Sequence, residues 1–129
     1  MIFIGVIAVL AFISVIYVGF SLSTGKRRLS AQQRKTIEQL WERMLKLDDP
    51  VRRVMEADSI FDKALTEIGY QGSLGEKLKE AGPRFYNLDA VWAAHKLRNH
   101  LAHQPGNSVK QKEMETAVRV LKRAIESLF

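Results

Sequence analysis

The hydrophobic and polar positions of the chain divide it into an apolar beginning and an amphipathic remainder. From Met1 to Leu22 no side chain is charged. As a helix this stretch would span about 33 Å, close to the roughly 30 Å of a bilayer's hydrocarbon core. No basic residue precedes the apolar run, and the run is longer than the apolar core of a cleaved signal peptide. We therefore predict an uncleaved transmembrane anchor over residues 1–22, which inserts into the lipid bilayer.

The rest of the chain repeats its apolar positions every three or four residues, as amphipathic helices do. Five helices follow from this spacing, over residues 31–47, 50–68, 74–82, 88–103 and 109–129. No run alternates with period two, so no strand is expected, and the short connections favour antiparallel neighbours. The predicted fold is all-α: a transmembrane helix (1–22), a polar juxtamembrane linker (23–29) and an up-and-down bundle of four or five helices (30–129).

Residues that begin and end helices support these boundaries. Side chains that accept hydrogen bonds from the first turn of a helix stand ahead of every predicted helix, at Ser30, Asp49, Ser73, Asn87 and Ser108. Pro50 fits the first helical position, and Gly69 suits the end of the second helix. Pro105-Gly106 is expected to end the fourth helix at His103.

Composition narrows the range of functions. Cysteine is absent, which excludes disulfides, thiolate metal sites and thiol nucleophiles. The net charge is +6, but five basic residues without an acid lie between residues 26 and 35, and beyond them 15 basic residues face 14 acidic ones. This juxtamembrane cluster consists of Lys26, Arg27, Arg28, Arg34 and Lys35. It predicts a single-pass protein of the cell membrane, with the N-terminus outside and the C-terminal domain in the cytoplasm. A broad surface that follows nucleic-acid phosphates is not indicated.

The fourth predicted helix, LDAVWAAHKLRNHLAH, carries the residues with the most chemical potential. At 100° per residue its apolar face is formed by Ala90, Val91, Ala94, Leu97 and Leu101. Arg98 falls inside this apolar arc, so it is not a simple solvated charge. His95, Asn99 and His103 follow one another at four-residue steps and form a polar ridge beside it.

The run Arg98-Asn99-His100-Leu101-Ala102-His103, followed by Pro-Gly, resembles the signature of the HEPN superfamily. In that signature an arginine, often followed by a polar residue, precedes a histidine late in one helix of a four- or five-helix bundle. The resemblance implies metal-independent RNA cleavage by a homodimer whose two chains line one cleft. It assigns His103 as general acid or base, Arg98 as the group that stabilises phosphate charge, and Asn99 as a positioning residue. It implies no cofactor.

The chemistry of these residue types fits that assignment. A histidine can move protons in either direction near neutral pH, and an arginine can grip two phosphate oxygens. Arg98 and His103, however, lie about 140° apart around a regular helix and diverge. Unwinding near Pro105 would bring them together, and so would the pairing of two copies across a two-fold axis.

Other interpretations stay open at this point. Arg98 can be a structural arginine paired with Asp58 or Asp62 of the second helix, and His103 can stabilise the end of its helix. The domain can be a non-catalytic HEPN-like module that dimerises or holds a protein partner at the membrane, or an unrelated bundle. Metal binding is not expected, because no thiolate exists and no carboxylate lies within a turn of His100 and His103.

Overall fold

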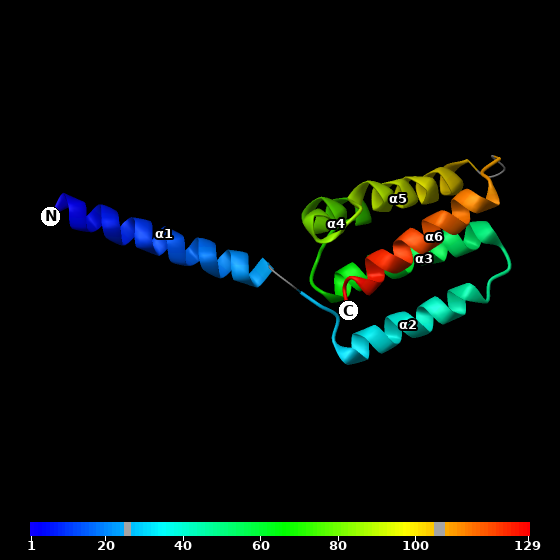
Figure 1. Cartoon of the computed structure of the whole chain (residues 1–129), viewed down its shortest axis with the longest axis horizontal. Coiled ribbons are helices and arrows are strands. Elements are labelled where there is room, and N and C mark those ends of the chain that lie inside the picture. The colour runs from blue at the N-terminus through cyan, green and yellow to red at the C-terminus, as the bar shows by residue number, and fades with distance from the viewer. Residues whose placement is uncertain (25–26, 105–107) are drawn as a thin grey trace.

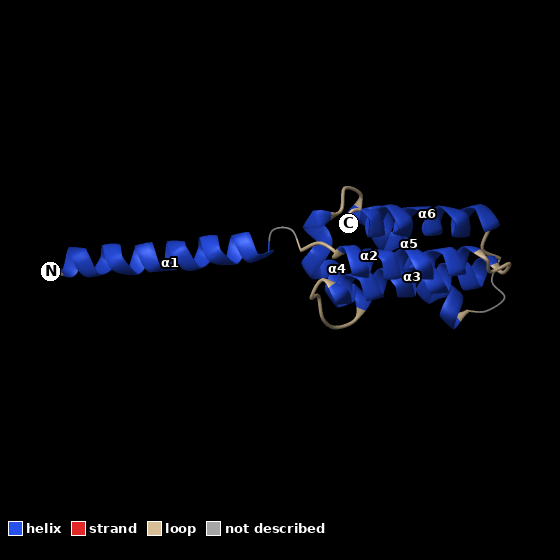
Figure 2. Cartoon of the chain, turned by 90° about the horizontal axis from the view of Figure 1, so that it is seen from below, coloured by secondary structure: helices blue, strands red, loops and turns tan. Residues whose placement is uncertain are grey.

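The chain is all-helical in its computed structural model, which describes residues 1–24, 27–104 and 108–129. No strand occurs in these ranges, as predicted. In chain order the elements are α1 (Ile2–Thr24), α2 (Ala31–Leu45), α3 (Pro50–Glu67), α4 (Leu74–Ala81), the 3₁₀ helix η1 (Gly82–Arg84), α5 (Leu88–His103) and α6 (Gln111–Glu126). Figures 1 and 2 show α1 extending away from a bundle formed by the other helices.

Helix α1 is apolar on every side and lies outside the bundle core. Its stretch Ile2–Gly19 has a mean hydropathy of 2.7, and none of it is buried. The helix is therefore long and apolar enough to cross a membrane. It continues to Thr24, so it takes in the first two residues of the predicted linker.

The four long helices of the bundle run in alternating directions, and α4 lies near one end of them (Figure 1). Helix α3 is central and contacts α2, α5 and α6, while α5 also packs along α6. The predicted core faces are confirmed. On α3 they comprise Val54, Ala57, Phe61, Ala64 and Leu65, all fully buried. An exception is Leu45, which remains 41% exposed, and α2 ends at this residue and not at residue 47 as predicted.

Most of the predicted helix caps are confirmed. Ser30 and Gln33 form a reciprocal capping box, and the side chains of Asp49, Ser73 and Asn87 each accept a backbone N–H of the following helix. Gly69 follows α3 with a positive φ of 97°, a conformation that favours glycine.

The predicted cap at Ser108 is wrong. Helix α6 begins at Gln111, and Lys110 occupies the N-cap position without a side-chain hydrogen bond. Val109 packs against a small cluster of Val54, Leu101 and Met114, and this tertiary contact holds the segment outside the helix. Helix α5 ends at His103 as expected, while Pro105-Gly106, the predicted terminator, lies outside the described residues.

Candidate functional site

The candidate site lies where α5 crosses α3. Val91, Ala94 and Leu101 turn one face of α5 into the core. This rotation directs the neighbouring arc, which carries His95 and Arg98, toward α3. The site therefore follows from the same amphipathic pattern that packs the helix.

Asp58 of α3 is the centre of the site. It is only 5% exposed, which is unusual for a carboxylate that lacks a partner. Its Oδ1 lies 3.0 Å from His95 Nδ1, and its Oδ2 lies 3.6 Å from Arg98 Nε. One buried carboxylate thus holds two side chains of α5 that are three residues apart.

Asn99 completes a ring of polar contacts with these three residues. Arg98 Nη1 donates to Asn99 Oδ1 at 3.2 Å, which leaves the Asn99 amide nitrogen facing His95 Nε2 at 3.4 Å. Because that nitrogen is a donor, His95 Nε2 accepts, and the ring proton sits on Nδ1, where it is donated to Asp58. The network fixes the tautomer and orientation of His95 and makes this histidine a positioning residue.

The network holds Arg98 in place but leaves some of its N–H donors available. Its Nε is buried and has no hydrogen-bond partner, since 3.6 Å to Asp58 is an ion-pair distance and too long for a hydrogen bond. Its side chain is 33% exposed. A guanidinium carries five N–H donors, and the contacts among the described residues take up a minority of them. The remainder can bind an anion such as a phosphate.

His103 does not join this network. It lies exposed in the last turn of α5, and its side chain makes no hydrogen bond or ion pair with another described residue. Because α5 stays helical to His103, the five-residue spacing turns its ring about 140° away from Arg98. One chain therefore brings Arg98 and Asn99 together and leaves His103 apart.

Asp58 and His95 are central to the geometry of the site, although the sequence pattern assigned a catalytic role to neither. Of the two candidate partners of Arg98, Asp58 is the one that pairs with it, while Asp62 binds Lys77 at 2.7 Å. The four-residue step from His95 to Asn99 is the signal that links His95 to the site.

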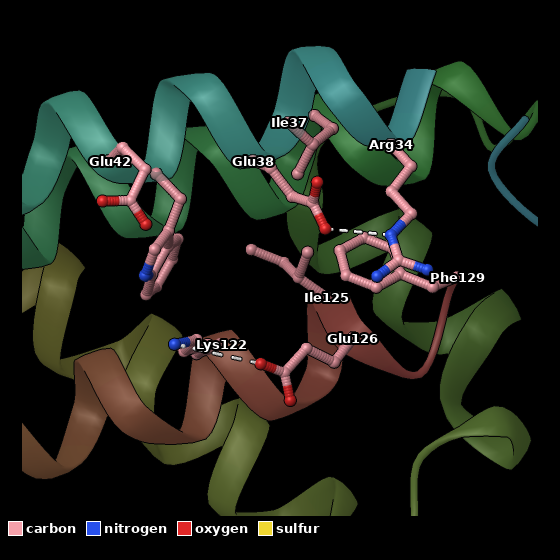
Figure 3. A pocket seen from close by; sticks show the side chains of 9 residues that line it. Arg34, Ile37, Glu38, Glu42, Lys122, Ile125, Glu126 and Phe129 are labelled. Carbon is pink, nitrogen blue, oxygen red and sulfur yellow. Dashed lines mark hydrogen bonds and ion pairs between the residues drawn. The ribbon is translucent and has the colours of Figure 1, made fainter. Parts of the chain in front are cut away.

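The larger cavities lie away from this network. A groove of about 600 Å³ lies between α2 and α6. Figure 3 shows Ile37 and Ile125 among its lining side chains. Its charges pair locally, Arg34 with Glu38 and Lys122 with Glu126. A second groove of about 940 Å³ follows α5 and α6 and is mostly apolar. Neither is lined by Arg98, Asn99 or His103, and no group of three metal-ligating side chains occurs in the described ranges.

Comparison with models of known protein families, with curated proteins and with solved structures finds no match. The HEPN resemblance stays a prediction that rests on the residues of α5.

Proposed function

We propose that the chain is a membrane-anchored HEPN-like domain that cleaves RNA without a metal ion, as a homodimer. The observation that carries this proposal is the Asp58–His95–Asn99–Arg98 ring, which presents a partly exposed guanidinium on the helix that also carries the exposed His103. Arg98 would bind the scissile phosphate and stabilise the charge that develops on it. Asn99 would hold the guanidinium in place.

His103 would supply the proton transfers. As a base it would take the proton of the ribose 2′-hydroxyl, whose oxygen then attacks the adjacent phosphorus. As an acid it would protonate the leaving 5′-oxygen. The products would be a 2′,3′-cyclic phosphate and a 5′-hydroxyl, so water is not needed for the first step.

The homodimer follows from the divergence of Arg98 and His103 within one chain. A two-fold axis beside α5 would bring Arg98 of one chain toward His103 of the other, and would do so twice. The anchor over residues 1–22 would hold both chains at the cell membrane, with the bundle in the cytoplasm because the basic cluster follows the apolar helix.

The direct test uses the full chain in lipid nanodiscs, incubated with mixed RNA and a chelator. We expect cleavage that leaves 2′,3′-cyclic ends and falls by about 10²-fold or more in Arg98→Ala and in His103→Ala. Arg119→Ala and His100→Ala are matched controls, since both replace exposed residues of the same types outside the proposed chemistry. Equal inactivity of wild type and all variants would contradict the proposal.

A mixing experiment tests the composite site. Chains with Arg98→Ala and chains with His103→Ala are co-reconstituted after each has been shown to be inactive alone. A heterodimer holds one intact site, so roughly a quarter of wild-type activity is expected after random pairing. No recovery, with dimers present, would mean that each site is built within one chain.

A specific observation favours a second function, a non-catalytic module that holds a protein partner at the membrane. The ring is closed on itself, with Arg98 already beside a buried carboxylate and His103 separate. This alternative predicts that the chain captures a partner while wild type and Arg98→Ala leave RNA equally intact.

A further inference from the structure

The residues that follow α1 are fixed to the bundle. Leu29 is buried, and its N–H donates to the main-chain oxygen of Leu128 at 2.8 Å. Arg28 Nη1 donates to the main-chain oxygen of Phe129 at 3.3 Å. This segment, Arg27 to Leu29, is called the strap below.

The strap is also held from the opposite side. Arg84 of η1 donates to the main-chain oxygen of Arg27, and the Arg27 guanidinium lies over the Tyr70 ring at 5.4 Å. The strap therefore binds the bundle at the end formed by η1, the turn after α3 and the end of α6, which is also the end nearest α1 in Figure 1.

Chain length places this end of the bundle close to the bilayer. Only residues 25 and 26 separate Thr24, the last residue of α1, from Arg27. Three residue steps reach at most about 11 Å. The headgroup layer on each side of a bilayer is roughly 5–8 Å thick. If α1 spans the membrane, the strap end of the bundle lies within or against the headgroups.

An exposed aromatic residue marks the same end. Tyr86 is fully exposed, and beyond α1 the only other exposed large hydrophobic residue in the described ranges is Leu45. Tyr86 is two residues from Arg84, so its Cα lies within about 7 Å of the residue that binds the strap. Tyrosine is enriched at membrane interfaces, where its ring meets acyl chains and its hydroxyl meets water.

Two exposed basic residues lie in the strap or shortly after it. Arg28 lies in the strap and Lys35 near the start of α2, and both are exposed. Glu80 lines a small cavity together with Arg27 and Arg84, so one acidic residue faces two basic ones there. Exposed acids also lie at this end, but Glu67 pairs with Lys63 and Glu126 with Lys122, so Arg28 and Lys35 add positive charge to it.

We propose that the strap end of the bundle, with Tyr86, Arg28 and Lys35, is a docking surface for anionic lipid headgroups and holds the bundle in one orientation on the bilayer. The inference rests on the proposed membrane anchor and is independent of RNA cleavage. Bilayer lipid is the occupant that fits, because the strap brings this surface to the headgroups and the exposed Arg28 and Lys35 add basic charge to it.

The absence of cysteine allows a clean test with the full chain. A single cysteine is introduced by Tyr86→Cys, or by Asp48→Cys in the exposed loop at the opposite end of α2, and is labelled with an environment-sensitive fluorophore. The labelled chains are reconstituted into phosphatidylcholine vesicles with and without phosphatidylserine. With phosphatidylserine, the label at position 86 should shift its emission to the blue and be shielded from acrylamide, while the label at position 48 should stay accessible.

Charge variants sharpen the result. Arg28→Gln in the chain labelled at position 86 should lower the ratio of docked to undocked bundles about fivefold. Lys112→Gln, which removes an exposed charge at the start of α6, should leave it unchanged. Both variants are checked for an unchanged helical spectrum.

Each remaining outcome overturns the inference in a distinguishable way. Equal accessibility of the two labels in a chain that resists alkaline extraction would remove the docking surface and leave the anchor. Release of the chain by alkaline extraction would remove the anchor and the docking surface together. Shielding that appears only when RNA is added to neutral vesicles would assign the surface to nucleic acid.

Discussion

Asp58 and Asp62 lie one turn apart on α3, and each forms an ion pair. The two pairs differ in which partner is buried. At Asp62 the cation is the buried partner: Lys77 is 4% exposed, and its ammonium donates to Asp62 and to the Thr66 hydroxyl at 2.7 and 2.6 Å, while the Asp62 side chain is 42% exposed. At Asp58 the carboxylate is buried and the cation, Arg98, reaches the surface.

The difference separates a structural pair from one with binding capacity. The Lys77 ammonium is enclosed, so a ligand cannot reach it without disturbing the packing of α3 against α4. The Arg98 guanidinium is anchored at its Nε edge and open at the other. Burial of the acid rather than of the base therefore leaves a guanidinium accessible to a ligand at the α3–α5 contact.

The largest expected effect comes from removal of the buried acid. Asp58→Ala would leave the His95 Nδ1 proton without its acceptor and Arg98 without its counter-ion. We expect the free energy of unfolding to fall by about 3 kcal/mol. Urea denaturation followed by tryptophan fluorescence measures it. Asp58→Asn keeps an acceptor for His95 and should cost less; equal losses would show that the retained acceptor stabilises nothing and that the charge of Asp58 accounts for the whole effect.

Removal of the two cations should give unequal results. Arg98→Met would leave the buried Asp58 with His95 alone, at a cost of about 2 kcal/mol after allowance for the exposure of Arg98. Lys77→Met would remove a buried charge and leave an exposed carboxylate that water can solvate, so the expected change is below about 1 kcal/mol. The same denaturation assay checks both. If Lys77→Met lowered the free energy of unfolding as much as Arg98→Met does, the distinction between the two pairs would not hold.

A conservative substitution tests whether the open edge of Arg98 matters for function. Arg98→Lys keeps the charge near Asp58 but loses the planar fork of donors. We expect stability to change little and RNA cleavage, if present in the wild type, to fall by about tenfold or more. Initial rates of RNA cleavage give the measurement, with Arg119→Lys as the matched control. Full activity of Arg98→Lys would reduce the role of Arg98 to simple charge.

The smallest effect is expected at Asn99. Asn99→Ala removes one hydrogen bond from Arg98 and one to His95, both at the edge of the network. We expect a loss of about 1 kcal/mol or less, measured by the shift of the urea midpoint. A larger loss, equal to that of Asp58→Ala, would mean that the ring acts as one cooperative unit.

Local sequence patterns predicted most of the fold because the forces involved are local. Apolar spacing located the helices, and Ser30, Asp49, Ser73 and Asn87 marked their starts through hydrogen bonds within one turn. The helix cap predicted at Ser108 was wrong because Val109 packs against residues of three helices. A short stretch of sequence does not reveal such a contact.

The candidate site was predictable only in part. The position of Arg98 inside the apolar arc indicated a partner on the second predicted helix, and the structure selects Asp58 over Asp62. Asp58 contacts both His95 and Arg98 because of the way α5 is rotated against α3. The sequence of one helix does not determine this rotation. The strap was equally hidden, since Leu29 pairs with a residue 99 positions away.

If α1 anchors the chain in a bilayer, the strap also restricts the symmetry of any dimer. A bundle held by one end turns about the bilayer normal but cannot be inverted, because inversion would pull its helix out of the lipid. A two-fold axis between two anchored copies must then stand perpendicular to the membrane plane. The two α5 helices would then point in the same sense along the bilayer normal, and each His103 would lie about 22 Å along α5 from its first residue, at the end of the bundle away from the strap. Two α5 helices that stand along the bilayer normal and run antiparallel would require the two anchors to enter different membranes.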